Sequence, residues 1–226
     1  MRILCVSDQV DPVVYSSSIR DRFRDVDLVL SAGDLPMDYL SFIVSGLNKP
    51  LLFVFGNHNL EELAYYRPRA DVRGRPIDTP WPSRELREGS GTVYAGFRVV
   101  REGGLIVAGL GGSRWYNGGA NQFTNLQMAL RILFLIPGLV WNRLFFGRYV
   151  DVLLTHAPPE GIHDLPDPCH RGFRPFLWFM RTFRPRFLVH GHVHLYDLTA
   201  PRVSRYGPTT VVNAYGHHIL EWEELP

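Results

Sequence analysis

Five short apolar runs, each stopped by a glycine or polar cluster, constrain the fold of this chain more than any other feature. They cover residues 3–6, 26–30, 51–55, 150–154 and 187–189. Continuous runs this short and rich in Val, Leu and Ile are typical of strands that are buried on both faces. Helical stretches at 17–24 and 37–47 lie between the first three runs. The order therefore predicts successive βαβ units with parallel strands.

The remaining segments have different patterns of apolar and polar residues. Residues 92–100 and 105–110 flank Glu102-Gly103-Gly104 and predict a hairpin. Residues 196–222 alternate β-branched and polar side chains, which predicts further antiparallel strands. Residues 121–146 are largely apolar and predict helix, which Pro137-Gly138 is expected to break into a pair. We therefore expect an α/β sandwich of two facing mixed sheets with helices outside.

The chain has no internal repeat and no low-complexity linker, so we expect a single domain over residues 1–226. Its composition, with 46% hydrophobic and 20% charged residues, is that of a soluble globular protein. The net charge of +2 gives no reason to expect a nucleic-acid partner. Cys5 and Cys169 are too few for a disulfide framework and match no CxxC metal motif.

Two sequence features bear on the cellular location of the protein. The first apolar run is interrupted at Ser7-Asp8, so it does not resemble a secretory signal, and we expect a cytoplasmic protein. The apolar residues 132–141 are too few for a transmembrane span and include Pro137. We expect the protein's own fold or a second subunit in a homo-oligomer to cover them. Contact with a membrane surface is the less favoured alternative.

Residues that can bind metal ions follow all five predicted strands. These residues are Asp8, Asp34, Asn57, His156, His192 and His194, with His58 next to Asn57. One aspartate after a strand is usually a cap or turn residue, and one histidine is usually structural. Because ligands gather at the carboxyl ends of strands in open α/β sheets, five such ends together predict a site. Aspartate with histidine suits Mn²⁺, Fe or Zn²⁺ rather than Ca²⁺.

These residues occur in the order of a known set of motifs. They read Asp8-Gln9-Val10, Gly33-Asp34, Gly56-Asn57-His58-Asn59, His156 and Gly191-His192-Val193-His194. In this order the chain resembles the calcineurin-like metallophosphoesterase family, whose motifs span residues 8 to 194. The resemblance implies a double β-sandwich flanked by helices, which agrees with the fold predicted above. It also implies hydrolysis of a phosphate monoester or diester by water activated between two divalent metal ions.

The resemblance also implies a role for each matching residue. Asp34 would bridge two metal ions. Asn57, His156 and His192 would complete one metal site, and Asp8 and His194 would serve the other. His58 would lie near the scissile phosphate and protonate the leaving oxygen.

Two positions depart from the family motifs. Val10 stands where the family has a ligating histidine, and Asn59 replaces an acidic residue. The metal site served by Asp8 is therefore expected to bind weakly, unless Asp11 supplies a carboxylate in place of the histidine. Asp11 precedes Pro12, and capping of the following turn is the favoured alternative for its side chain.

Three further residues are candidates for substrate binding. Arg114 lies in a glycine-rich loop, and His163 and His170 lie in a proline-rich loop after His156. Both loops have a plain alternative as structural turns. The chain as a whole also has an alternative, a degenerate family member that binds phosphate or a protein partner without hydrolysis. Retention of His58 beside six candidate ligands favours the enzyme, with a phosphate ester as its partner and two divalent ions as cofactors.

Overall fold

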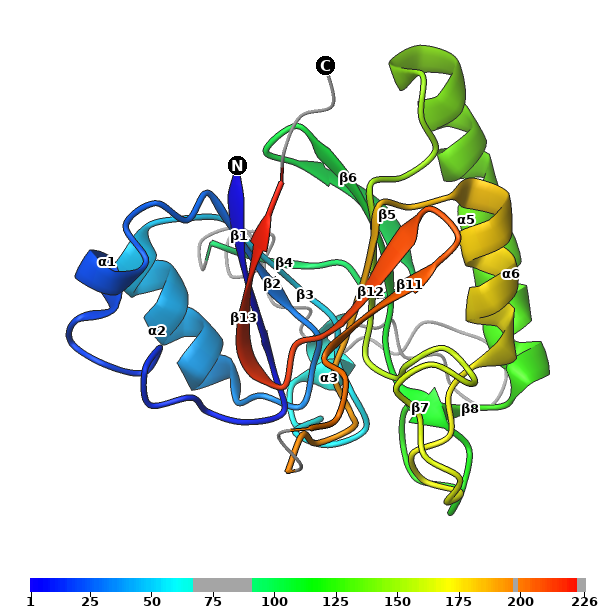
Figure 1. Ribbon diagram of the computed structural model, residues 1–226, viewed down its shortest axis with the longest axis horizontal. Helices are drawn as coiled ribbons and strands as arrows, with labels where there is room; N and C mark the ends of the chain where they lie inside the picture. The colour runs from blue at the N-terminus through cyan, green and yellow to red at the C-terminus, as the bar shows by residue number, and fades with distance from the viewer. Residues whose placement is uncertain (67–90, 197–198, 223–226) are drawn as a thin grey trace.

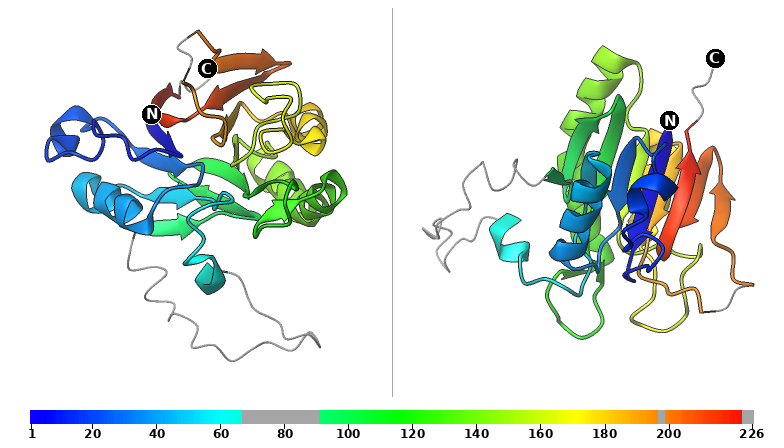
Figure 2. Two further views of the ribbon diagram at one scale, coloured as in Figure 1. Left: turned by 90° about the horizontal axis from the view of Figure 1, so that it is seen from below. Right: turned by 90° about the vertical axis from the view of Figure 1, so that its left-hand side faces the viewer.

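The computed structural model describes residues 1–66, 91–196 and 199–222. Two large mixed sheets face each other at the centre, and helices cover both outer faces (Figures 1 and 2). This arrangement confirms the predicted α/β sandwich. Residues 67–90, 197–198 and 223–226, which fall inside the predicted single domain, lie outside the described residues.

The first sheet has the strand order β13-β1-β2-β3-β4. Its strands are β1 (Arg2–Ser7), β2 (Leu28–Ser31), β3 (Leu51–Phe53), β4 (Thr92–Tyr94) and β13 (Gly216–Glu221). The first four are parallel, and β13 pairs antiparallel with β1. Short α1 (Ile19–Arg22) and α2 (Met37–Leu47) connect the first three strands, as the βαβ prediction requires.

The second sheet has the order β11-β12-β10-β9-β6-β5. Its strands are β5 (Arg98–Glu102), β6 (Leu105–Leu110), β9 (Val152–Thr155), β10 (Phe187–His190), β11 (Val203–Tyr206) and β12 (Thr209–Asn213). The central four strands are parallel, with an antiparallel strand at each edge. A small pair, β7 (Ser113–Arg114) and β8 (Gln122–Phe123), and the short α3 (Leu63–Tyr66) lie outside the large sheets.

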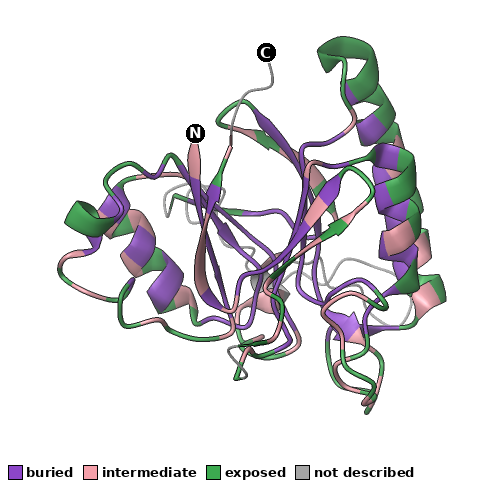
Figure 3. Cartoon of the chain, viewed as in Figure 1, coloured by how far each residue is buried: buried purple, intermediate pink, exposed green. Residues whose placement is uncertain are grey.

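Three apolar layers hold the sandwich together. The middle layer packs Cys5 and Leu30 of the first sheet against Leu154 of the second. One outer layer joins the first sheet to α1 and α2, and the other joins the second sheet to α5 (Asn125–Phe146) and α6 (Arg174–Phe183). Strand β1 contributes to two layers, because alternate side chains face opposite sides of a sheet. Strands β1 and β2 are accordingly buried along nearly their whole length (Figure 3).

The predicted hairpin strand at 92–100 is wrong in one respect. Its first part is β4 of the first sheet and its second part is β5 of the second, so the chain crosses between the sheets near Ala95. The turn itself is confirmed: β5 and β6 pair around Gly103 and Gly104, both with positive φ. A two-residue turn of this kind requires positive φ at both central positions.

The prediction of a helix pair at 121–146 is wrong. Helix α5 is continuous, begins with a capping box formed by Thr124 and Gln127, and ends at Gly147. Pro137 lies inside it on the exposed face, one turn after the exposed Leu133. The carbonyl group that loses its helical donor to this proline therefore lies on the solvent side.

The expectation that α5 is covered holds for only one of its faces. Met128, Ile132, Leu135 and Leu139 are buried against the second sheet, whereas Leu126, Phe134 and Leu144 are exposed. By length and composition α5 meets the criteria for a bilayer-crossing helix, and 22% of its most apolar window is buried. A single helix of this kind is weak evidence for a membrane span, so α5 is no clear transmembrane segment.

Candidate metal centre

The predicted ligands converge at one edge of the sandwich. Asp8 follows β1, Asp34 follows β2 and Asn57 follows β3, while His156 follows β9 and His192 follows β10. Parallel strands end at the same edge, so residues far apart in the sequence and from both sheets meet there. The convergence that the strand ends predicted is therefore present.

The backbone at this edge is unusual. Asp8, Asp34 and His192 all have positive φ, at 62°, 56° and 68°. Side chains other than glycine rarely adopt this region, and such strain is typical of functional sites. The neighbouring glycines allow the close approach: a Cβ atom at Gly56 would overlap the carboxylate of Asp34, and one at Gly191 would overlap Asp8.

His156 is the fully buried centre of the first group of ligands. Its Nδ1 lies 2.8 Å from the carbonyl oxygen of Ala32, so Nδ1 donates a hydrogen bond to it and Nε2 faces the other ligands. Around Nε2 lie Oδ2 of Asp34 at 3.2 Å and Oδ1 of Asn57 at 3.2 Å. His192 adds its Nδ1 at 3.1 Å.

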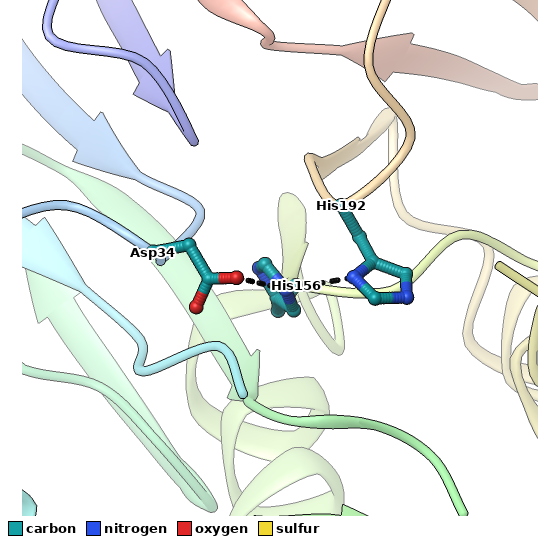
Figure 4. Close-up of side chains that lie close together, drawn as sticks. All are labelled: Asp34, His156 and His192. Atoms are coloured by element: carbon teal, nitrogen blue, oxygen red, sulfur yellow. Dashed lines mark hydrogen bonds and ion pairs between the residues drawn. The ribbon is translucent and has the colours of Figure 1, made fainter. Parts of the chain in front are cut away.

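His192 is also oriented by a hydrogen bond from its ring to a backbone carbonyl group. Its Nε2 donates to the carbonyl oxygen of Cys169 at 2.6 Å, which leaves the lone pair of Nδ1 directed at His156. Figure 4 shows His156 between Asp34 and His192. Metal-bound histidines commonly donate their second ring N–H to a carbonyl group, which fixes the tautomer. We call Asp34, Asn57, His156 and His192 the buried half of the centre.

The ligand atoms of these four residues lie close enough together to share one cation. Oxygen and imidazole nitrogen together suit Mn²⁺, Fe or Zn²⁺, so the residues fit a divalent transition-metal ion. Asp34, His156 and His192 have ligand atoms within 4.8 Å of one another. A proton on His156 is the alternative occupant of this point.

The pKa values of these groups follow from their surroundings. Burial disfavours the charged form of His156, but Asp34 outweighs it and raises the pKa of His156 to about 9. Burial of Asp34 is likewise outweighed by His156, and the pKa of Asp34 falls to about 2. Burial, reinforced by the charge of His156, lowers the pKa of His192 to about 3. Near neutral pH, one proton therefore has to leave before a metal ion binds.

Asp8 and His194 form what we call the open half. Both carboxylate oxygens of Asp8 accept the backbone N–H of His192, at 3.0 and 2.9 Å. Nε2 of His194 lies 3.9 Å from Asp8, and its Nδ1 contacts the hydroxyl of Tyr196 at 2.6 Å. Burial raises the pKa of Asp8, an effect that the positive charge of His156 opposes. Val10, in the position of the family's histidine, is 38% exposed.

His58 lies beside the buried half without forming part of it. Its backbone N–H donates to Oδ1 of Asp34 at 2.8 Å, and its side chain is exposed. The adjacent Asn59 is exposed with a φ of 49°. His58 therefore helps to orient Asp34 through its backbone while its ring stays accessible to a substrate. The predicted catalytic role of the ring remains a prediction.

Asp11 contacts a residue that the sequence did not connect with it. Its Oδ1 accepts the backbone N–H of Val13 at 2.8 Å, which is the predicted turn-capping bond. Its Oδ2 lies 2.6 Å from Nδ1 of His217 on β13. The carboxylate is thus engaged with the turn and with His217, and the alternative role as a metal ligand remains a prediction.

The three predicted substrate residues are placed around the centre in different ways. Arg114 donates to the carbonyl oxygen of Gly172, so it joins the two loops. His163 contacts His190 at 2.9 Å and Ser204 at 2.8 Å. His170 is paired with Asp167 at 2.9 Å, and its ring centroid lies 5.4 Å from that of His192. His170 is the one whose ring neighbours a predicted ligand, and all three roles remain predictions.

Several residues of the centre were missed from the sequence. His190 is fully buried, with Nδ1 on the carbonyl of Gly191, and it anchors the turn that carries His192. Asn121 donates to the carbonyl groups of Phe55 and Gly56 and holds the turn before Asn57. The sequence did contain a signal for His190, because it begins the histidine-rich run His190-Gly191-His192-Val193-His194. Nothing local pointed to Asn121, because it comes from a distant loop.

The fold and this edge define a class of protein, an α/β-sandwich with a histidine–carboxylate metal centre. The profile of the calcineurin-like phosphoesterase family matches residues 1–196, and the chain belongs to this family. The predicted resemblance is therefore confirmed. The family uses divalent metal ions and acts on phosphate esters.

Two solved structures, with TM-scores above 0.6, agree with this assignment at the level of the fold. The protein TT1561 of Thermus thermophilus is 14% identical, with a TM-score of 0.61 over 95% of this chain and 89% of that chain. Another crystal structure is also 14% identical and has a TM-score of 0.62 over 97% of this chain and 94% of its own. A novel archaeal phosphodiesterase has 13% identity and a TM-score of 0.43, over 98% and 93% of the two chains. No curated protein matched the sequence.

Proposed function

We propose that this protein is a metal-dependent hydrolase of a phosphate monoester or diester. The observation that carries the proposal is the buried half, where Nε2 of His156 and Nδ1 of His192 lie 3.1 Å apart beside the carboxylate of Asp34. Each histidine donates its other N–H to a backbone carbonyl, so both are held in the tautomer that binds metal. Family membership supplies the substrate class.

Asp34, Asn57, His156 and His192 would hold one ion, and Asp34, Asp8 and His194 would hold a second. Bound divalent ions would polarise the phosphoryl group and lower the pKa of water. The chain's own contribution is to hold the donors of the buried half in place through backbone carbonyl groups. The ring of His58, exposed one residue after Asn57, would donate a proton to the departing oxygen.

The test separates metal binding from proton donation. With Mn²⁺ added, we expect hydrolysis of an aryl phosphomonoester or an aryl phosphodiester, and chelation should abolish it. His58→Ala should lower kcat by about 10²–10⁴-fold, the usual contribution of a general acid. Because the backbone bond from residue 58 to Asp34 is kept, metal content should not change.

His217→Ala is a suitable control, since it removes a histidine that contacts Asp11 rather than the buried half. Wild-type turnover in His58→Ala would exclude the proton-donor role. Absence of hydrolysis with every substrate, despite bound metal, would exclude the enzymatic proposal.

One observation favours a second candidate. Val10 leaves the open half without the family's histidine, and His194 lies 3.9 Å from Asp8. A chain that binds a single ion and a phosphate group without turnover would have this construction. Phosphate binding that depends on metal, with no hydrolysis of monoesters or diesters, would support this scaffold function.

A further inference from the structure

The outer face of α5 presents a stripe of exposed apolar side chains. Phe134 is 83% exposed, Leu144 74% and Leu126 70%. The stripe also includes Leu130, Leu133, Val140, Trp141 and Phe145. With the exposed Pro137 between Leu133 and Val140, these residues recur at intervals of three and four along one helix, so they form a continuous surface rather than scattered exposed positions. Figure 3 shows this outer face as exposed, opposite the buried face on the second sheet.

The stripe extends onto the neighbouring helix. An open groove of about 320 Å³ lies between the first turns of α5 and α6 and is lined by Leu126, Ala129, Pro175 and Trp178, with Arg174 at its edge. Trp141 and Trp178 are both more than one-third exposed. Exposed tryptophans beside aliphatic side chains are typical of surfaces that enter the headgroup region of a bilayer.

The two helices carry charges of one sign only. Helices α5 and α6 carry Arg131, Arg143, Arg174 and Arg181 and no acidic residue, and Arg184 and Arg186 directly follow α6. The whole chain has a net charge of only +2, so the rest of the chain is net negative. Arg143 and Arg174 are exposed on the two helices, and Arg174 lines the groove. Three of the other arginines pack on aromatic rings, Arg131 on Phe123, Arg181 on Tyr206 and Arg186 on Trp222.

From these observations we propose that the outer face of α5, with the first turn of α6, binds the surface of an anionic lipid bilayer. The apolar side chains would enter the interface, and Arg143 and Arg174 would contact lipid phosphates. A second copy of the chain fits this face less well. In a symmetric dimer the same patch would face itself, and arginines would meet arginines without an acidic partner on either helix.

Vesicle flotation tests the proposal with the intact protein. We expect binding to phosphatidylcholine vesicles that contain phosphatidylglycerol, and much weaker binding to phosphatidylcholine alone. Phe134→Ser with Leu144→Ser should weaken binding to anionic vesicles by about tenfold or more, since each side chain buries apolar area at the interface. Both residues are exposed, so the fold should be unaffected.

Matched controls distinguish binding through this face from nonspecific adsorption to vesicles. Val203→Thr changes an exposed apolar residue on β11 and should leave binding unchanged. Arg143→Gln with Arg174→Gln should weaken binding to anionic vesicles severalfold, whereas Arg24→Gln, beside α1, should not. Added salt should weaken the binding of the wild-type protein.

Three results would overturn the proposal. The first is no binding to anionic vesicles, and the second is equal binding by the wild-type protein and by Phe134→Ser/Leu144→Ser. The third is a concentration-dependent dimer that this double variant abolishes, without vesicle binding. That last result would assign the face to a second copy of the chain.

Discussion

The two halves of the metal centre use similar residues but support them differently. In the buried half, His156 and His192 each donate one ring N–H to a fixed backbone carbonyl. In the open half, His194 contacts the hydroxyl of Tyr196, a highly exposed side chain, and Val10 takes the place of a second histidine. Support by rigid backbone directs lone pairs to one point before any ion arrives. We therefore expect one tight metal site and one weak site.

The largest effect should come from removal of His156. In His156→Ala the point shared by Asp34, Asn57 and His192 loses its central donor. We expect loss of the tightly bound ion and a fall in kcat/KM of about a thousandfold, since bound metal supplies several kcal/mol of transition-state stabilisation. Elemental analysis and turnover with added Mn²⁺ provide the measurement.

His194→Ala is the matched change in the open half. It should leave the tight ion in place and affect only the second. Because His156 is fully buried, circular dichroism must show that the first variant is folded. Equal metal loss in the two folded variants would remove the distinction between the halves.

The next largest difference between the two halves should be in the pH dependence of metal binding. The pKa of His156 is raised to about 9 in the metal-free protein, above its ordinary 6.5. Its proton therefore stabilises the folded state fully below pH 6.5, and this contribution is lost as the pH rises to about 9. Metal must displace the same proton, so affinity at the buried half should rise about tenfold per pH unit up to about pH 9.

Calorimetric titration in two buffers of different ionisation enthalpy measures the released proton directly. At pH 7 we expect about one proton released per tightly bound ion, because the pKa values of Asp34 and His192 lie far below this pH. His156→Asn should abolish the release. A metal affinity that does not change between pH 6 and 8 would mean that His156 is neutral before metal binds.

Sequence reasoning predicted the buried half better than the surroundings that orient it. Strands buried on both faces produce continuous apolar runs, and a polar residue shortly after each run, such as Asp34 or His156, lies at the shared edge. The carbonyl groups of Ala32 and Cys169 that orient the histidines carry no sequence signal, because every residue has a carbonyl. The pairing of Asp11 with His217 joins residues 206 positions apart, and no local pattern links them.

The same limits explain the errors in the fold. The crossing of residues 92–100 from one sheet to the other depends on the partners of each half, β3 for one and β6 for the other. Strand propensity contains no such information. Helix α5 continues through Pro137 because that residue lies on the solvent-exposed face. The sequence does not reveal this face, because apolar residues occur on nearly all sides of the helix.

A smaller effect should follow from restoring the family's histidine in the open half. Val10→His should strengthen binding of the second Mn²⁺ ion by about tenfold, a modest gain for an added ligand on an exposed turn. Val13→His is the matched control, because Val13 lies in the same turn with similar exposure, 39% against 38%. Metal titration followed by electron paramagnetic resonance separates the two ions. Equal gains in the two variants would show that the added histidine acts nonspecifically.

The smallest effect on metal should come from Asp11→Ala, which asks whether the open half recruits a carboxylate. Asp11 accepts the backbone N–H of Val13 and contacts His217, and its side chain is only 17% exposed. Its removal should lower the free energy of unfolding by about 1 kcal/mol, the usual value of a turn-capping bond. Metal affinity at both sites should stay unchanged.

His217→Ala removes the partner of Asp11 while keeping the carboxylate, so it should be destabilising without any effect on metal affinity. If second-site affinity fell in Asp11→Ala and rose in His217→Ala, the freed carboxylate would be a ligand, and the contact with His217 would compete with metal binding.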